Sequence, residues 1–123
     1  MRVETIQYFS AKEEEFVNLL IDIGTKKNAA KLLVFLSSVP EASSRLIEHG
    51  TDMRQPEVCV AMKYLKEQGW IRVKGESSEN KGRPMKIYEL ALPMAQIMNS
   101  LEEGKKNEAR DQLALIRKLR DHI

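Results

Sequence analysis

The stretch that decides the fold is residues 51–90, which read TDMRQPEVCVAMKYLKEQGWIRVKGESSENKGRPMKIYEL. Its first part carries apolar side chains at the spacing of one helix face: Val58, Met62 and Leu65. Pro56 suits the first residue of such a helix, where its missing N–H costs nothing, and Gly69 follows the last apolar position. The pattern predicts a helix over about residues 55–68.

Two strands are expected after this helix. Residues 70–74 alternate between apolar and polar side chains, which places Ile71 and Val73 on one face of a half-buried strand. Residues 85–92 return to an apolar pattern, and the polar segment 75–82 between them is predicted to be a loop. The stretch therefore predicts a helix followed by a β-hairpin with a long, basic tip.

A helix is expected to begin directly after Ser10. Ser10 and Glu13 have the spacing of a capping box, in which each side chain binds the other residue's backbone N–H. The helix should run over about residues 11–23, and Gly24 supplies the left-handed residue that closes many helices. Residues 1–9 have no clean periodicity, and a strand, a helical turn and an arm laid on a partner all remain open.

Two more helices are expected between this first helix and the deciding stretch. Thr25 can cap the second, whose interior is apolar over more than half of its circumference, and Pro40 should stop it. Ser43 or Ser44 can cap a short third helix, and Gly50 is expected to end it. The predicted fold class is mostly α with a small β-hairpin.

This order of elements is that of a winged helix-turn-helix, and the chain resembles that superfamily over about residues 11–92. Residues 44–48, SRLIE, and 55–71, QPEVCVAMKYLKEQGWI, are similar to the second and third helices of MarR-type and ArsR-type regulators. In those families a valine and two leucines of the reading helix pack inward, and the helix closes with Leu-x-x-x-Gly-aliphatic. The corresponding residues here are Val58, Met62, Leu65, Gly69, Trp70 and Ile71.

The predicted hairpin carries a second resemblance. Residues 81–90, KGRPMKIYEL, are similar to the Gly-Arg-Pro-x-x-x-Tyr-x-Leu wing common in archaeal regulators and in PadR-type proteins. The reading helix departs from both families, because ArsR-type metal sensors carry a Cys-x-Cys pair where this chain has only Cys59. MarR-type proteins often have Ser-Thr-Val-Ser-Arg where residues 56–60 read PEVCV. Metal sensing is therefore not expected, and base-specific contacts are expected to be few.

The resemblance implies a DNA-binding transcriptional regulator, with the reading helix, about 55–68, in the major groove. It implies that the wing, about 75–86, lies on the minor groove or on phosphates. If Val58, Met62 and Leu65 face the core, helical geometry turns the opposite residues towards the groove. The residues predicted to contact DNA are Arg54, Gln55, Glu57, Cys59, Val60, Lys63, Lys66, Lys81, Arg83 and Lys86.

Individual roles follow from the donor and acceptor pattern of the major groove. Gln55 can pair with adenine, Val60 can touch a thymine methyl group, and Lys63 can reach guanine or phosphate. Glu57 can accept from cytosine or merely stabilise the helix start. Cys59 can obstruct docking when oxidised, although a small side chain at a tolerant position is the simpler interpretation.

The wing is expected to matter more for affinity, and the reading helix for orientation. Arg83 lies between glycine and proline, as the arginine of an AT-hook does, and is predicted to enter a narrow minor groove. Lys81 and Lys86 would then contact phosphates. Ordinary solvated charges at a polar hairpin tip are the alternative interpretation.

Composition limits the other functions of this 123-residue chain to a few classes. Its net charge is only +2, but residues 54–90 hold eight basic and five acidic side chains, so the positive excess lies on the predicted reading module. No paired carboxylates, nucleophile with a base, or phosphate-binding glycine loop is apparent, and Cys59, His49 and His122 make no metal motif. We therefore expect no enzyme, no metal and no cofactor. The residues around Met1 do not resemble a secretory signal and no apolar run could span a bilayer, so a cytoplasmic location is expected.

The C-terminal segment 93–123 is predicted to be a helical dimerisation segment beside a DNA-binding domain of residues 1–92. Its apolar residues recur at helical spacing, either on one helix through Lys105 or on two helices broken at Gly104. Apolar surface is left for a second copy, so we expect a homodimer on a palindromic site. The alternative function is a protein-interaction or architectural chromatin module that does not read a specific site. No effector can be identified from the sequence.

Overall fold

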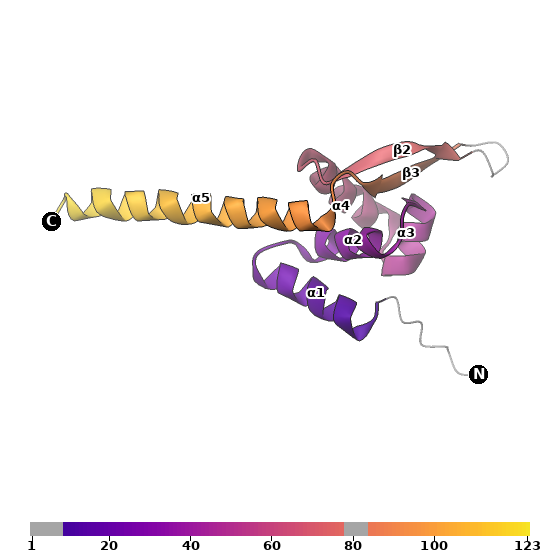
Figure 1. The fold of residues 1–123 in the computed structure, drawn as a ribbon, viewed down its shortest axis with the longest axis horizontal. Coiled ribbons are helices and arrows are strands. Elements are labelled where there is room, and N and C mark those ends of the chain that lie inside the picture. The colour runs from indigo at the N-terminus through magenta and orange to yellow at the C-terminus, as the bar shows by residue number, and fades with distance from the viewer. Residues whose placement is uncertain (1–8, 78–83) are drawn as a thin grey trace. The chain divides into compact units, whose positions relative to one another are not determined.

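The computed structural model describes residues 9–77 and 84–123, in which the chain divides into two compact units, Met1–Ala91 and Leu92–Ile123 (Figure 1). In the first unit the elements follow in the order α1, α2, β1, α3, α4, β2 and β3. The second unit contains α5. The predicted fold class, mostly α with a small antiparallel β structure, is confirmed.

The first helix, α1 (Ala11–Asp22), begins with the predicted capping box. The Glu13 N–H donates to Ser10 Oγ at 3.1 Å, and the Ser10 N–H donates to Glu13 Oε1 at 2.9 Å. Gly24 follows the helix with φ of 108°, the left-handed conformation that glycine adopts without strain. The sequence therefore locates both ends of α1.

The second helix, α2 (Lys27–Ser38), is the centre of the core, but its predicted cap is wrong. Lys26 occupies the cap position without a side-chain hydrogen bond. Thr25 is buried instead, and its N–H donates to the Leu20 carbonyl at 2.9 Å, so it closes α1. The helix ends two residues before Pro40, as expected. Its fully buried side chains are Ala30, Leu32, Leu33 and Val34.

The short helix α3 (Ser44–Thr51) continues past the glycine that was expected to end it. Ser43 caps its start and accepts from the Leu46 N–H at 3.2 Å. Asp52, with φ of 56°, closes the helix in the left-handed conformation. Gly50 lies inside α3, where a Cβ atom would lie 2.2 Å from Phe35 Cε1. This position is glycine because α2 and α3 approach closely there.

The fourth helix, α4 (Gln55–Glu67), has the predicted core face. Its apolar side chains Val58, Met62 and Leu65 are all at most 4% exposed. Pro56 is the second helical residue rather than the first, and Arg54 occupies the cap position. Gly69 has φ of 81° and leads into the buried Trp70, so the end of α4 also agrees with the sequence.

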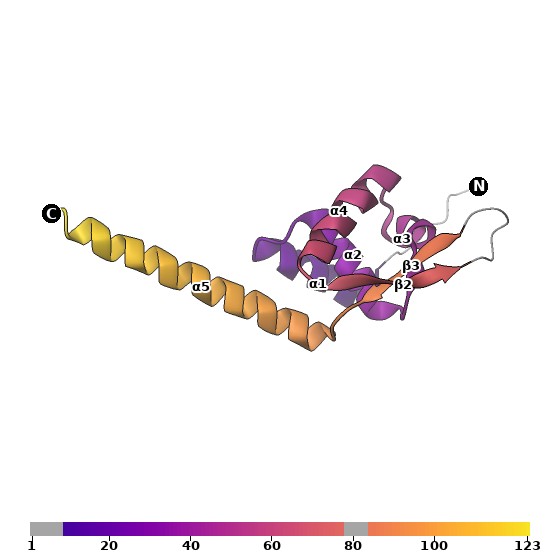
Figure 2. The ribbon, with the colours of Figure 1, turned by 90° about the horizontal axis from the view of Figure 1, so that it is seen from above.

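The β structure is a three-stranded antiparallel sheet in the order β1-β3-β2, rather than a hairpin alone. The additional strand, β1 (Ala42–Ser43), is two residues long and pairs with Ile87 and Tyr88. The other strands are β2 (Ile71–Ser77) and β3 (Met85–Leu90). Figure 2 shows their hairpin beside α3 and α4, in agreement with the contacts of α3 with β3 and of α4 with β2.

The hairpin differs from its sequence-based outline in two places. Residues 75–77 were predicted to be loop but continue β2, and the register shifts between Val73 and Gly75. Ile71 and Val73 do share a face, since their partners Leu90 and Tyr88 lie two residues apart on β3. Val73 is nevertheless exposed, because it lies further out along the hairpin than the buried Ile71. The second strand ends at Leu90, two residues earlier than predicted.

The C-terminal helix α5 (Met94–Arg120) is unbroken. Gly104 lies inside it, and a Cβ atom added to this glycine would have nothing within 4 Å, so residue 104 neither breaks the helix nor is glycine for lack of space. With 27 residues, α5 is about 40 Å long. Its exposed large apolar side chains are Leu113, Leu115, Ile116 and Leu119. In the described part of the chain, no helix combines the length and the apolar character needed to cross a bilayer.

Candidate nucleic-acid interface

The outer side of α4, together with its cap residue Arg54, carries seven of the ten residues predicted to contact DNA. All seven are exposed: Arg54, Gln55, Glu57, Cys59, Val60, Lys63 and Lys66. Their exposure follows directly from the burial of the opposite face, because a helix that packs through positions 58, 62 and 65 must turn these residues outward. Being exposed does not mean, however, that these residues form a single surface.

Four of these residues meet at one cavity. Gln55, Cys59, Lys63 and Lys66 lie along the same edge of α4 and line an open hollow of about 200 Å³. The remaining lining residues are Ser44 at the start of α3, Tyr88 of β3, and the core side chains Val58 and Met62. We refer to this hollow as the α4–β3 cavity.

Two contacts within the α4–β3 cavity orient its polar groups. Gln55 Nε2 donates to Cys59 Sγ at 3.4 Å, and Lys66 Nζ lies 5.9 Å from the centre of the Tyr88 ring. The second distance is that of a cation–π contact. Burial raises the pKa of the Tyr88 hydroxyl above its ordinary value, with a smaller contribution from Cys59. A tyrosine hydroxyl is protonated at neutral pH even without this shift, so it can donate a hydrogen bond.

Two other predicted residues lie at a different hollow. Glu57 and Val60 line an opening of about 370 Å³ between α4 and the start of α2. Its remaining lining residues are Lys26, Lys27, Asn28, Ala29, Ala61 and Tyr64. The structure thus divides the predicted groove-facing set between two edges of α4. Sequence reasoning missed the lysine pair, although Lys26 and Lys27 are adjacent in the sequence and directly precede the α2 interior.

Glu57 has a structural role at the start of α4. Its Oε1 accepts from the Arg54 backbone N–H at 2.9 Å, which satisfies one of the donors that a helix start leaves without an intrahelical partner. A carboxylate in the first turn also stabilises the positive end of the helix dipole. Of the two sequence interpretations of Glu57, the geometry favours stabilisation of the helix start.

The wing residues are placed unevenly. Lys81 and Arg83 lie outside the described residues. Lys86 is exposed on β3, where it pairs in register with Glu76 of β2. Alternation along a strand puts Lys86 on the same face of the sheet as Tyr88, and therefore on the side that borders α4.

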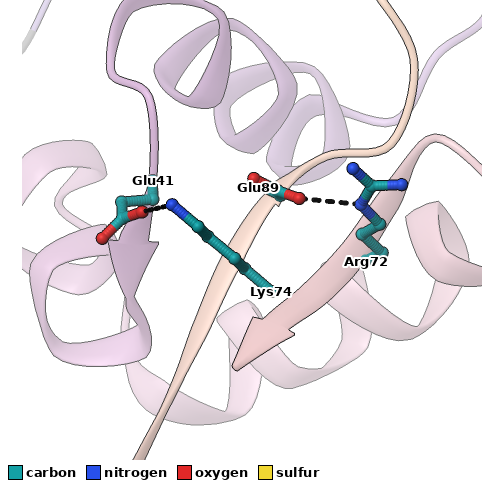
Figure 3. A network of polar contacts seen from close by, with 4 residues as sticks. All are labelled: Glu41, Arg72, Lys74 and Glu89. Atoms are coloured by element: carbon teal, nitrogen blue, oxygen red, sulfur yellow. Dashed lines mark hydrogen bonds and ion pairs between the residues drawn. The ribbon is translucent and has the colours of Figure 1, made fainter. Parts of the chain in front are cut away.

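Two basic residues of the hairpin are already paired with carboxylates (Figure 3). Arg72 Nε lies 2.8 Å from Glu89 Oε2 on the neighbouring strand. Lys74 donates to Glu41, which precedes β1, so this contact reaches across the central strand. The hydrogen bond and the charge of Glu41 raise the pKa of Lys74. By contrast, Lys63 and Lys66 have no ion pair within residues 9–77 and 84–123.

The positive charge excess of residues 54–90 is therefore smaller in effect than the count of basic residues suggests. Arg72 and Lys74 contributed to the eight basic residues counted between positions 54 and 90, but their charge is largely compensated within the sheet. Of the described basic residues in this stretch, Lys63 and Lys66 at the cavity edge, together with Arg54 and Lys86, have no ion pair within residues 9–77 and 84–123. Among the described residues, no group of three or more His, Cys, Asp or Glu side chains could hold a metal ion.

Comparisons with known proteins identify the fold. No protein-family model matches the chain, and no curated protein matches it. Among solved structures it is similar to TrmBL2, an archaeal chromatin protein whose structure shows a novel mode of DNA binding. The match has a TM-score of 0.71 at 13% identity, covers 90% of this chain, and spans only 40% of the TrmBL2 chain. Together with the observed elements, it shows that this chain has a winged-helix-like fold.

Proposed function

We propose that this protein binds double-stranded DNA, with α4 in the major groove and the β2–β3 wing against the minor groove or phosphates. The observation that carries the proposal is the exposed, uncompensated basic edge of α4, formed by Lys63 and Lys66 beside Gln55. A duplex carries one negative charge per about 1.7 Å of its axis, so it is a suitable partner for cations that have no ion pair among the described residues.

The winged-helix-like fold supports the same proposal, because this fold commonly presents one helix to the major groove. The similar chain, TrmBL2, is described as a DNA-binding chromatin protein. The resemblance of residues 44–71 to MarR-type and ArsR-type regulators, and of residues 81–90 to the Gly-Arg-Pro wing, favours a regulator of transcription. On this proposal the protein works inside the cell, where the DNA is.

We propose further that the protein acts as a homodimer through α5. Leu113, Ile116 and Leu119 recur at intervals of three residues, and they are 44–65% exposed. Apolar side chains at this spacing on an exposed helix are typical of a helix–helix contact. A two-fold dimer would present two copies of α4, and half-sites separated by about 34 Å would fit one turn of DNA.

A second candidate is an architectural DNA binder with little sequence preference. It is favoured by the small and apolar residues on the outer side of α4, where Cys59 and Val60 are exposed and Val60 is 70% exposed. Such side chains offer few hydrogen bonds to base edges. The description of TrmBL2 as a chromatin protein agrees with this candidate.

One binding experiment separates the two candidates. The full chain is titrated onto random duplex DNA and onto duplexes selected for tight binding, at several salt concentrations. A steep salt dependence with equal affinity for both pools would identify an architectural binder, since phosphate contacts are salt-dependent and carry no sequence information. A preference of about a thousand-fold or more for selected DNA would identify a site-specific regulator. If the protein binds neither pool at low salt, DNA binding is excluded, and a protein partner is favoured.

A further inference from the structure

We propose that the α4–β3 cavity is a binding site for a tetrahedral oxyanion. This chemistry is shared by a phosphodiester of the DNA backbone and by a free phosphate or sulfate group. The inference deepens the proposed function when the anion belongs to DNA, but the cavity geometry stands without it. It assigns to Ser44, Lys66 and Tyr88 a joint role that none of them has in the helix-and-wing description.

The cavity is lined by five residues with hydrogen-bond donors, by the Cys59 thiol and by two apolar side chains. Lys63 and Lys66 supply two ammonium groups, and Gln55 supplies a side-chain amide. Ser44 and Tyr88 add two hydroxyl groups from the other side, and the floor is formed by Val58 and Met62. No described carboxylate lines the cavity. Donor-bearing residues from three elements around one hollow, without an acidic group, are suited to a multiply charged oxygen ligand.

The size of the cavity restricts the ligand. About 200 Å³ is less than the roughly 300–1,000 Å³ of sites for drug-sized molecules. It holds a compact ion with part of its water, or one phosphate group of a larger molecule that continues outside. The hollow is open towards solvent along the edge of α4, so a polymer backbone can pass over it.

The positions of the charged groups favour an anion over a cation. Neither Lys63 nor Lys66 has an ion-pair partner among the described residues. The carboxylate of Glu57 lies on the other edge of α4 and is bound to the Arg54 N–H. Lys66 is steadied over the Tyr88 ring, which reduces the conformational freedom that an anion must otherwise remove.

The first test measures binding of the free ion. Amide chemical shifts of the full chain are followed by NMR while sodium phosphate replaces sodium chloride at constant ionic strength and pH 7. We expect saturable shifts at Ser44, Gln55 and Lys66. Lys66→Gln should lower the affinity for phosphate about ten-fold, since a charge-assisted hydrogen bond contributes roughly this factor to binding. Lys12→Gln, which removes one charge from an exposed residue of α1, should leave binding unchanged.

The second test asks whether DNA supplies the oxyanion. Duplexes are prepared in which one phosphate at a time is replaced by an uncharged methylphosphonate. If a backbone phosphate occupies the cavity, the methylphosphonate at one position of the duplex should lower the affinity of the unaltered protein about ten-fold. The same position should have no further effect on Lys66→Gln, because the two changes remove the same contact.

The outcomes are distinguishable. Saturable phosphate shifts that Lys66→Gln weakens support the cavity site even if the protein fails to bind DNA, which would overturn the proposed function alone. If one methylphosphonate position couples to Lys66→Gln but free phosphate does not bind, the site is supported, and DNA is the only source of its oxyanion. The inference is overturned if phosphate gives no saturable shift and no methylphosphonate position couples to Lys66. It is also overturned if Lys12→Gln reduces binding as much as Lys66→Gln.

Discussion

The helices α4 and α5 are both amphipathic, but they bury different shares of their apolar side chains. In α4 the apolar face is fully packed and the cations Lys63 and Lys66 are uncompensated. In α5 Ile97 is buried, but the large apolar side chains Leu113, Leu115, Ile116 and Leu119 are exposed. Polar groups pair in the middle of this helix: Lys106 with Glu102, Lys105 with Glu108 and Arg110 with Asn107. On the proposed function, the lysines of α4 face an anionic partner, and the exposed apolar side chains of α5 face a second copy of the helix.

The largest difference between the helices should appear in stability. Leu65→Ala removes a fully buried side chain from α4 and should lower the free energy of unfolding by about 2–5 kcal/mol. Leu119→Ala removes a side chain that is 65% exposed, so it should affect stability only through association. Urea denaturation at several protein concentrations measures both effects. A loss of several kcal/mol for Leu119→Ala at the lowest concentration would mean that α5 is packed within the chain.

The association itself is tested by placing charge on the apolar face of α5. The double variant Ile116→Glu, Leu119→Glu should be monomeric at micromolar concentration, because burying two unpaired carboxylates costs several kcal/mol. The matched control is Arg117→Glu, which adds acidic charge on the same exposed helix but outside the apolar series. Light scattering after gel filtration gives the mass of each variant. If the unaltered protein is itself a monomer under these conditions, the dimer is excluded.

The role of the uncompensated cations is tested by comparison with paired ones. Lys63→Gln with Lys66→Gln should weaken DNA binding and reduce the slope of log affinity against log salt by about 2, since each phosphate contact contributes about 0.9. Lys106→Gln removes a cation that pairs with Glu102 on α5, and the slope should stay constant. An unchanged slope in the double variant would show that α4 does not contact phosphates.

The sequence predicted those features whose cause lies within a few residues. The spacing of Val58, Met62 and Leu65 determines the buried face of α4, and the capping box determines the start of α1. The two-residue strand β1 could not be predicted, because its hydrogen bonds are with β3, more than forty residues away. Gly50 was misinterpreted for the same reason, since the cause of the glycine is the Phe35 ring on α2.

For the candidate interface, too, the sequence predicted the features with a local cause and missed those that depend on distant residues. Which residues of α4 are exposed follows from the helical period alone. Their division between two hollows depends on neighbours that the period does not specify, Tyr88 on one edge and Lys26 on the other. The compensation of Arg72 and Lys74 by Glu89 and Glu41 likewise depends on strand order. The roles predicted for Lys81 and Arg83 stay predictions.

The smallest expected effect is that of Gly104→Ala in α5, and the glycine of α3 provides the comparison. Gly104→Ala in α5 should raise the free energy of unfolding by about 0.5–1 kcal/mol, because alanine restricts the unfolded chain and the site has open space around it. Gly50→Ala in α3 should instead destabilise by about 1–3 kcal/mol, because the new methyl group collides with Phe35. Thermal melting by circular dichroism compares the two. A stabilising Gly104→Ala that leaves the oligomeric mass unchanged would show that residue 104 lies outside the association surface. A destabilising one would mean that a partner helix packs against that glycine.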